Sequence, residues 1–520
     1  MAISAAPRAQ GAPVPTLQAT NERWGFACTT PAEEEEYVSP TTFDSSAIPY
    51  SGEALKLAAL LRRYYRQRAV RERMLEFLGG TDPQNISAAY ISGVTGASEL
   101  GEASVPASLL GCWEAGLEID RSLWDRDTLI AHIDLEYHNF DNPAAAWLEP
   151  DRAFRLQQPV LKSTFRILAE SGIAPLTLLT GRGFHLVWAV RRDSRVFREL
   201  VGLGRVPASL QRRYQQPCSP QGWSVDPELG RAFAGLGLLM EFIWHRVLAA
   251  CDVRDGVSVH PVAIEVGPGA RGREIVAFDI SEYGDPLHTR QIRVPFSAYL
   301  KPRQFEWLLG EEGVRSLMPI FEVPLSGMTP AQAIAVSRDA EAVVALARHS
   351  SATIPEACLG MENLLSAYRG SEIHAFHERF YRDLEGLVCP TDDNAPIPGA
   401  PSCLEWILDH PNDLLLKPAA MQHVVRLLMS LGWQPASIAR RISAAYRKDC
   451  DWGDMWRRLD PDNRALFYTR LFAGMIVTGA DKLIDFNCVS HREKGYCTIS
   501  DCGSNLAAYR EGLEMLRRGR

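Results

Sequence analysis

Two carboxylates separated by one residue are the first candidates for chemistry in this sequence. Asp134 and Glu136 lie in the apolar stretch 129–137, whose length and composition predict a strand. Because strand side chains alternate between faces, both carboxylates share one face with His132 and His138. Hard divalent cations such as Mg²⁺ and Mn²⁺ prefer carboxylate oxygens. Taken alone, the pair is more typical of an edge strand with its polar face in water.

A Gly-Arg-Gly turn between two apolar runs is the second candidate. Glycine lets a backbone approach a phosphate closely, and an arginine can pair with phosphate through two hydrogen bonds. A simple hairpin turn is the alternative when the motif is taken alone. No Gly-x-x-x-x-Gly-Lys-Ser/Thr occurs, so a P-loop is excluded. The residues of this candidate are Thr180, Gly181, Arg182, Gly183 and His185.

A third carboxylate and a basic segment follow downstream. Asp279 closes the apolar run 275–280, and Arg293, Ser297 and Lys301 then recur at spacings of four. Arginine and lysine beside a metal-bound triphosphate neutralise its charge, which phosphoryl transfer requires. Each of these residues taken separately is also typical of a solvated surface charge.

The order of these three groups resembles the archaeo-eukaryotic primase superfamily, over roughly residues 75–305. That family carries an Asp-x-Asp/Glu motif, a Ser-Gly-Arg-Gly-x-His-like motif and a third strand-end Asp. Thr180 replaces the more usual serine and keeps the hydroxyl, and His132 and His138 match no part of the motif. The resemblance implies that three carboxylates hold two Mg²⁺ or Mn²⁺ ions: Asp134, Glu136 and Asp279. It implies a nucleotide-binding set of Thr180, Gly181, Arg182, Gly183, His185, Arg293, Ser297 and Lys301.

A group of cysteines near the C-terminus predicts a second metal centre. Cys403 follows a proline-rich break, and Cys488, Cys497 and Cys502 come much later, unlike the close pairs of common zinc fingers. The pattern resembles the C-terminal domain of the large primase subunit, which holds a [4Fe-4S] cluster on four widely spaced cysteines. Thiolates also suit zinc, in which case His491 is a further candidate ligand. Two lesser candidates are Cys389 and Cys450.

Arginines and tryptophans are interleaved in the same region. Aromatic side chains and arginine can together hold single-stranded template by stacking and by charge. A solvated helical face with one or two core tryptophans is the equal alternative. The residues are Arg440, Arg441, Arg447, Lys448, Arg457, Arg458, Trp433, Trp452 and Trp456.

The elements that must position these residues change along the chain. Strand signals in the middle third give way to helical patterns after about residue 330, which predicts an α+β fold. We expect a primase-type catalytic domain with mixed β-sheets and flanking helices, then a mainly α-helical, metal-binding C-terminal domain. Strands are predicted at 129–137, 176–180, 184–190, 262–266 and 275–280. Helices are predicted at 51–78, 151–171, 228–250, 329–348, 361–388, 403–409, 417–431, 436–447 and 463–477.

Composition predicts four segments along the chain and a cellular location. We predict a flexible arm at 1–50, the catalytic domain at 51–330, a helical linker at 331–390 and the Cys-rich domain at 391–520. No apolar run reaches the length of a membrane span and the N-terminus does not resemble a signal peptide, so we expect a cytoplasmic protein. The net charge of −8 argues against coating nucleic acid by bulk positive charge but allows a local basic groove.

Together these features predict a DNA primase or primase-polymerase. It would bind single-stranded DNA template and nucleoside triphosphates, with no membrane association, and helicases or replication proteins are possible partners. One alternative is a repair or mobile-element polymerase that extends primers without starting them. Another is a non-catalytic nucleic-acid-binding protein on the same fold. A metal-dependent nuclease leaves the Gly-rich hairpin and the basic segment unexplained.

Overall fold

The computed structural model describes residues 52–94, 105–106, 108–219, 221–251, 257–264, 273–386, 396–448, 459–499 and 502–518, all within one compact unit. The fold is mixed α+β, with 57% of residues helical and 13% in strands, which confirms the predicted class. Several predictions fall outside the described residues, namely the arm at 1–50, Cys389, Cys450, Trp452, Trp456, Arg457 and Arg458.

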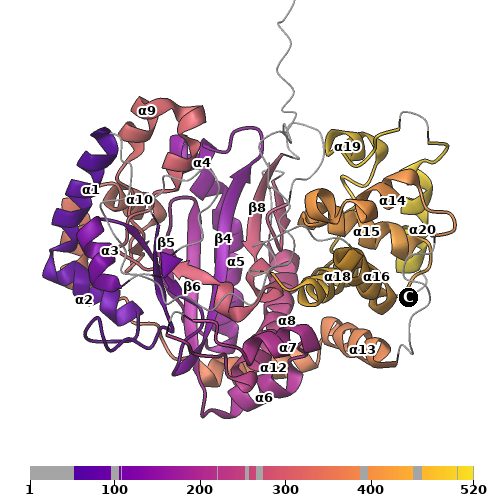
Figure 1. The fold of residues 1–520 in the computed structure, drawn as a ribbon, viewed down its shortest axis with the longest axis horizontal. Helices are drawn as coiled ribbons and strands as arrows, with labels where there is room; N and C mark the ends of the chain where they lie inside the picture. The colour runs from indigo at the N-terminus through magenta and orange to yellow at the C-terminus, as the bar shows by residue number, and fades with distance from the viewer. Residues whose placement is uncertain are drawn as a thin grey trace, which may run out of the picture. The chain divides into compact units, whose positions relative to one another are not determined.

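A six-stranded sheet with order β10-β5-β6-β4-β8-β7 forms the centre of the fold (Figure 1). The long strand β4 lies between β6 and β8 and is antiparallel to both, while β7 runs parallel to β8. Its strands are β4 (Thr128–Asn139), β5 (Leu176–Leu179), β6 (Gly183–Arg191), β7 (Ser258–His260), β8 (Glu274–Asp279) and β10 (Val323–Pro324).

A smaller antiparallel sheet has the order β2-β1-β3-β9. Its strands are short, and the sequence patterns did not reveal them. They are β1 (Ile91–Val94), β2 (Val105–Pro106), β3 (Glu118–Ser122) and β9 (Gln291–Arg293). Since β9 ends at Arg293, this sheet carries the first residue of the predicted basic segment.

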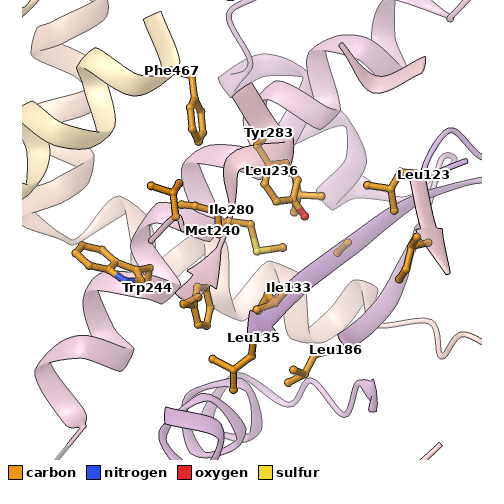
Figure 2. Close-up of a cluster of buried hydrophobic side chains, with 14 of the residues drawn as sticks. Leu123, Ile133, Leu135, Leu186, Leu236, Met240, Trp244, Ile280, Tyr283 and Phe467 are labelled. Atoms are coloured by element: carbon orange, nitrogen blue, oxygen red, sulfur yellow. The ribbon is translucent and has the colours of Figure 1, made fainter. Parts of the chain in front are cut away.

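Two long helices cover one face of the central sheet. Ile133 and Leu135 of β4 and Leu186 of β6 lie in one buried cluster with side chains of α8 (Figure 2). Phe184, on the same face of β6, packs edge to face on Phe154 of α5, with ring centroids 5.3 Å apart. The opposite face of β4 is thereby left to its polar residues. These two helices are α5 (Pro150–Ser171) and α8 (Pro227–Ala250).

The remaining described helices surround the two sheets and build the C-terminal region. Those before residue 330 are α1 (Gly52–Tyr65), α2 (Arg68–Phe77), α3 (Leu109–Ala115), α4 (Ala145–Leu148), α6 (Arg195–Leu203), α7 (Ala208–Tyr214), η3 (Ser281–Gly284), η4 (Leu287–Thr289), η5 (Lys301–Phe305) and α9 (Glu306–Leu317). Those after it are α10 (Pro330–Ser337), α11 (Ala340–His349), α12 (Cys358–Arg369), α13 (Glu372–Gly386), α14 (Ser402–Asp409), η6 (Pro411–Leu415), α15 (Pro418–Ser430), α16 (Pro435–Lys448), α18 (Pro461–Val477), α19 (Cys488–Glu493) and α20 (Leu506–Arg518).

Helix α18 connects the C-terminal helices to the central sheet. The side-chain amide of Asn463 donates to the backbone carbonyl of Gly284, 2.8 Å away, directly beyond the turn that follows β8. Arg464 lies 3.5 Å from Asp285. Phe467 reaches the apolar cluster beside Tyr283 (Figure 2). The C-terminal helices therefore pack on the segment that carries Asp279.

Three details differ from the sequence-based expectations. The strand predicted at 262–266 is wrong, because its described part is irregular and the strand lies at Ser258–His260. The helices predicted at 51–78, 329–348 and 361–388 are each two helices with a short break. Periodicity alone did not reveal these breaks, because the apolar pattern continues across them.

Helix α8 meets a looser test for a membrane span, although no uninterrupted apolar run in it reaches that length. By length and composition Pro227–Ala250 passes that test, although 72% of its most apolar window is buried in the fold. Its apolar side chains face β4 and the C-terminal helices, and it carries the buried, ion-paired Glu241. The helix packs as the central core helix of this unit.

Candidate active site on the polar face of β4

Asp134 occupies the centre of the polar face of the sheet. In the strand register it is the direct partner of His185 on β6 and of Asp279 on β8. Direct partners in antiparallel strands project from the same face with their Cβ atoms about 5 Å apart. Glu136 shares this face one pleat further on, and its partner on β6 is Gly183, which has no side chain to cover it. Three predicted carboxylates and the predicted histidine therefore meet at one place.

Glu136 is held by cations. Its Oε2 lies 2.5 Å from Nη2 of Arg182 and 3.2 Å from Nε2 of His138. Burial alone would raise the pKa of this carboxyl, but Arg182 and Lys301 hold it well below its usual value. Glu136 is therefore a stable anion at neutral pH.

The other two carboxylates are electrostatically strained. Burial, followed by the charges of Glu136 and Asp279, raises the pKa of Asp134 well above its usual value. Burial also raises the pKa of Asp279, although its Oδ1 accepts a hydrogen bond from the backbone of Ser281 at 2.8 Å. In the described part of the chain, Oδ1 of Asp134 is buried without a hydrogen-bond partner. A cation at this face would relieve both the repulsion and the orphaned oxygen.

The side chains are not arranged as a complete metal site. Among the described residues, no group of three or more His, Cys, Asp or Glu side chains is placed to hold an ion. At this face Glu136 is turned to Arg182. The orphaned oxygen of Asp134 and the all-carboxylate donor set nevertheless fit a hard divalent cation, with Asp134, Glu136 and Asp279 as the residues that would hold it.

Lys301 brings a further positive charge to the same face. Burial, followed by the charges of Arg182 and Arg293, lowers its pKa to about 8 against the opposing effect of Glu136 and Asp134. These electrostatic neighbours place the ammonium among the predicted carboxylates and arginines. The basic segment and the Gly-Arg-Gly turn are thus brought together, as the sequence predicted.

The hydroxyl of Thr180 is engaged within its own turn. Its Oγ1 accepts hydrogen bonds from the backbone N–H groups of Arg182 at 3.2 Å and Gly183 at 3.0 Å. The hydroxyl therefore shapes the turn, and the same two N–H groups are occupied by it.

The two glycines are required by close packing. A Cβ on Gly181 would lie 2.4 Å from the ring of Tyr299, and one on Gly183 would lie 1.8 Å from the backbone oxygen of Leu135. Neither glycine has a positive φ. The structure thus gives the glycines a packing role in addition to the predicted approach to a phosphate.

Arg293 and Ser297 contact groups other than the three carboxylates. Arg293 pairs with Glu118 and lies 3.6 Å from Oε2 of Glu322. The fully buried hydroxyl of Ser297 accepts from the backbone of Ile119 at 2.7 Å. Ser297 thus fastens the basic segment to the small sheet.

Two glutamate–histidine pairs at this face escaped the sequence analysis. Nδ1 of His185 lies 3.0 Å from Oε1 of Glu322, and Nδ1 of His132 lies 2.9 Å from Oε2 of Glu282. The two imidazole rings meet edge to face at 4.8 Å. His132 had the right strand parity, but neither glutamate lies in a motif, and their proximity arises only in the folded chain.

The four predicted C-terminal cysteines gather near one another. Burial raises the pKa of Cys403 to about 12, and the next causes are Cys497, Cys502 and Cys488. All four are free thiols. The sulfur atoms of Cys497 and Cys502 face nearby backbone carbonyl oxygens at 3.3 Å and 3.6 Å. Although they do not form a ready ligand set, this group of thiols fits a thiolate-bound centre.

His491 and the predicted basic surface have internal partners instead. Nε2 of His491 lies 2.8 Å from Nδ1 of the buried His423, so this nitrogen is committed within the fold. Arg440 donates to the carbonyl of Leu384, and Arg447 pairs with Asp462. These two arginines therefore contact other parts of the helical region.

Comparison of the chain with protein-family models, with curated proteins and with solved structures found no match. Function is therefore inferred from the geometry of the β4 face and of the cysteine group.

Proposed function

We propose that the chain is a primase-polymerase that joins nucleotides on a single-stranded DNA template. The observation that carries this proposal is the position of Asp134, which has Asp279 and His185 as its two cross-strand partners. Lys301 lies in the same electrostatic cluster. The fold proposed with this function is a primase-type catalytic domain followed by a helical, metal-binding domain.

The proposed reaction is nucleotidyl transfer from a nucleoside triphosphate, either NTP or dNTP. A 3′-hydroxyl attacks the α-phosphorus, the bond from that phosphorus to the bridging oxygen breaks, and pyrophosphate leaves while the hydroxyl loses its proton. Bound Mg²⁺ or Mn²⁺ would supply Lewis-acid stabilisation of the attacking and leaving oxygens.

The chain's own cations would bind the triphosphate. Arg182 and Lys301 both act on Glu136, so they lie beside the carboxylates and can pair with phosphate oxygens there. Nε2 of His185 lies 3.6 Å from Oδ1 of Asp134. A nucleotide phosphate beside Asp134 would therefore be within reach of this imidazole nitrogen. Arg293, which lies 3.6 Å from Glu322, adds positive charge near these residues.

The carboxylates would hold the metal ions that act on the reacting groups. Asp134 and Asp279 face one another across β4 and β8, and both have raised pKa values when no cation is beside them. Because Arg182 neutralises Glu136, occupation of this site requires Arg182 to exchange that carboxylate for a phosphate. Nucleotide binding would thereby release Glu136 for its predicted role.

We also propose a metal centre on Cys403, Cys488, Cys497 and Cys502, with a [4Fe-4S] cluster favoured over zinc. Support comes from the burial of Cys403 and from the other three thiols, each of which lies near enough to raise its pKa. Anaerobic purification followed by metal analysis tests this. A brown protein containing iron supports the cluster, and its Cys403→Ser variant should lose most of the iron. A colourless protein that contains zinc contradicts it.

The test of the function is synthesis on single-stranded template with labelled NTPs or dNTPs and Mg²⁺ or Mn²⁺, with and without a primer. Product without a primer supports a primase. Product only with a primer supports the extension-only polymerase. If there is no product and nucleotide binding does not depend on metal, the non-catalytic reading is supported. Asp134→Ala with Glu136→Ala should reduce any product to background.

A further inference from the structure

Glu322 lies where the two predicted nucleotide-binding motifs meet. Its backbone pairs with the basic segment, since Glu322 N–H donates to the carbonyl of Ser297 at 3.1 Å and its own carbonyl accepts from Phe296 at 2.6 Å. The next residue begins β10, which pairs with β5 immediately before the Gly-Arg-Gly turn. The glutamate is thereby fixed to both motifs by its backbone.

The side chain of Glu322 is completely buried and touches one residue of each motif. Oε1 lies 3.0 Å from Nδ1 of His185, and Oε2 lies 3.6 Å from Nη1 of Arg293. A carboxylate that accepts the Nδ1–H of an imidazole fixes the ring and turns the other nitrogen outward. That nitrogen, Nε2 of His185, lies 3.6 Å from Asp134 on the polar face.

The contact with Arg293 is incomplete. Within the described chain, Oε2 of Glu322 and Nε of Arg293 are both buried without a hydrogen-bond partner. A buried carboxylate is stable only when it is paired, so Glu322 requires both neighbours. One buried carboxylate therefore lies between two residues that the sequence assigned to nucleotide binding, joined to His185 by a hydrogen bond and to Arg293 by charge.

We propose that Glu322 is a positioning residue that aligns His185 and Arg293 for the triphosphate. This inference rests on the proposed function, because it assigns His185 and Arg293 to the same nucleotide. Glu322 itself does not touch the nucleotide. It sets the direction of Nε2 of His185 and limits how far Arg293 can move.

A chemically matched control is present elsewhere in the fold. Glu241 is also completely buried and also joins a histidine to an arginine, with His377 Nε2 at 3.0 Å and Arg470 Nε at 2.9 Å. It lies on α8 and contacts α13 and α18, away from the polar face of β4. Glu322→Gln and Glu241→Gln thus make the same chemical change at two places.

The experiment measures equilibrium binding of ATP and dATP in the presence of Mn²⁺, together with the melting temperature of each variant. Glu322→Gln should weaken nucleotide binding about tenfold or more. This is the size of effect known when the hydrogen-bond partner of a metal-binding histidine is removed. Glu241→Gln should lower the melting temperature and leave nucleotide affinity within about twofold. In a His185→Ala background, Glu322→Gln should weaken binding by much less, because its main partner is gone.

Each outcome decides the matter. Unchanged binding by Glu322→Gln, or an effect just as large in the His185→Ala background, overturns the positioning role while leaving the proposed function intact. Failure of the wild type to bind either nucleotide overturns the proposed function and this inference with it. If Glu322→Gln does not fold, Glu322→Asp takes its place, because it keeps the charge but withdraws it from His185. Full binding by Glu322→Asp contradicts the inference.

Discussion

Two buried glutamates, Glu241 and Glu322, each lie between a histidine and an arginine, one among the helices and one at the candidate site. At Glu241, Arg470 and His377 satisfy both carboxylate oxygens, and the other imidazole nitrogen of His377 lies 2.9 Å from the hydroxyl of Tyr368. Burial would raise the pKa of Glu241, but Arg470 and His377 lower it to about 2. This group is complete without any ligand.

The group around Glu322 is incomplete by comparison. Its second oxygen is 3.6 Å from Arg293, and unsatisfied buried atoms of Asp134, Arg182 and Tyr299 belong to the same electrostatic neighbourhood. Buried polar groups are normally satisfied. In the proposed function, the nucleotide and its metal would supply partners for these atoms. The two glutamates therefore differ in whether the fold itself supplies a hydrogen-bond partner to each carboxylate oxygen.

The largest expected effect is at the carboxylates. Asp134→Ala with Glu136→Ala should reduce nucleotide transfer by at least about a thousandfold, because the residues proposed to hold the metal are lost. The melting temperature should fall while the protein stays folded, because losing Glu136 leaves the buried Arg182 without its partner and only part of this is offset by relief of the repulsion at Asp134.

Transfer rates and thermal melting of the double variant check this prediction. Asp141→Ala is its matched control, because Asp141 lies just beyond the end of β4 and is exposed. Near-wild-type transfer by the double variant would place the chemistry elsewhere.

The next effect is on stability. Glu241→Ala leaves Arg470 and His377 buried without their partner, and breaking such a pair destabilises a fold by about 3–5 kcal/mol. Denaturant-induced unfolding followed by circular dichroism should show this loss, with nucleotide affinity of the folded fraction retained. An unchanged midpoint would mean that the two glutamates do not differ as the comparison requires.

A smaller effect per residue is expected from acid. Burial lowers the pKa values of His245, His260 and His288 to about 4, against a usual value of 6.5. Below pH 6.5 the unfolded chain binds protons that the folded protein does not, so stability is lost as the pH falls from about 6.5 toward 4.

Melting temperatures between pH 7.5 and 4.5 at constant ionic strength measure this loss. Each such histidine contributes about 1.4 kcal/mol per pH unit. His288→Gln should therefore flatten the dependence by one proton. A melting temperature that is constant between pH 7 and pH 5 contradicts the assignment of these histidines as buried and neutral.

The smallest effect is at an exposed pair. Arg68 and Glu72 are 2.7 Å apart on α2, but their side chains are 92% and 43% exposed. Solvent screens such pairs, so Glu72→Ala should not measurably change the melting temperature or the nucleotide affinity. A clear loss of stability would show that pairing by itself, without burial, stabilises this fold.

The sequence revealed those parts of the site that depend on local pattern. Strand parity predicted that Asp134 and Glu136 share a face, and the turn composition predicted the hairpin that ends in His185. The fold class followed from the change of periodicity along the chain, and the long elements α5, α8 and β4 were predicted within two residues at each end.

What remained hidden depends on long-range packing. Glu322 acquires its role only because β10 pairs with β5 and brings it to His185, which is 137 residues earlier. The strands of the small sheet are two to five residues long and have no clear alternation. The internal partners of Thr180 and Ser297 are likewise backbone groups that no side-chain pattern encodes.

The most direct test of the central claim is Mn²⁺ binding, followed by electron paramagnetic resonance, with and without ATP or dATP. The account predicts that nucleotide increases Mn²⁺ binding to the wild type, and that Asp134→Ala with Glu136→Ala abolishes this increase while the protein stays folded. Equal, nucleotide-dependent Mn²⁺ binding by both proteins would contradict the assignment of the β4 face as the metal and nucleotide site.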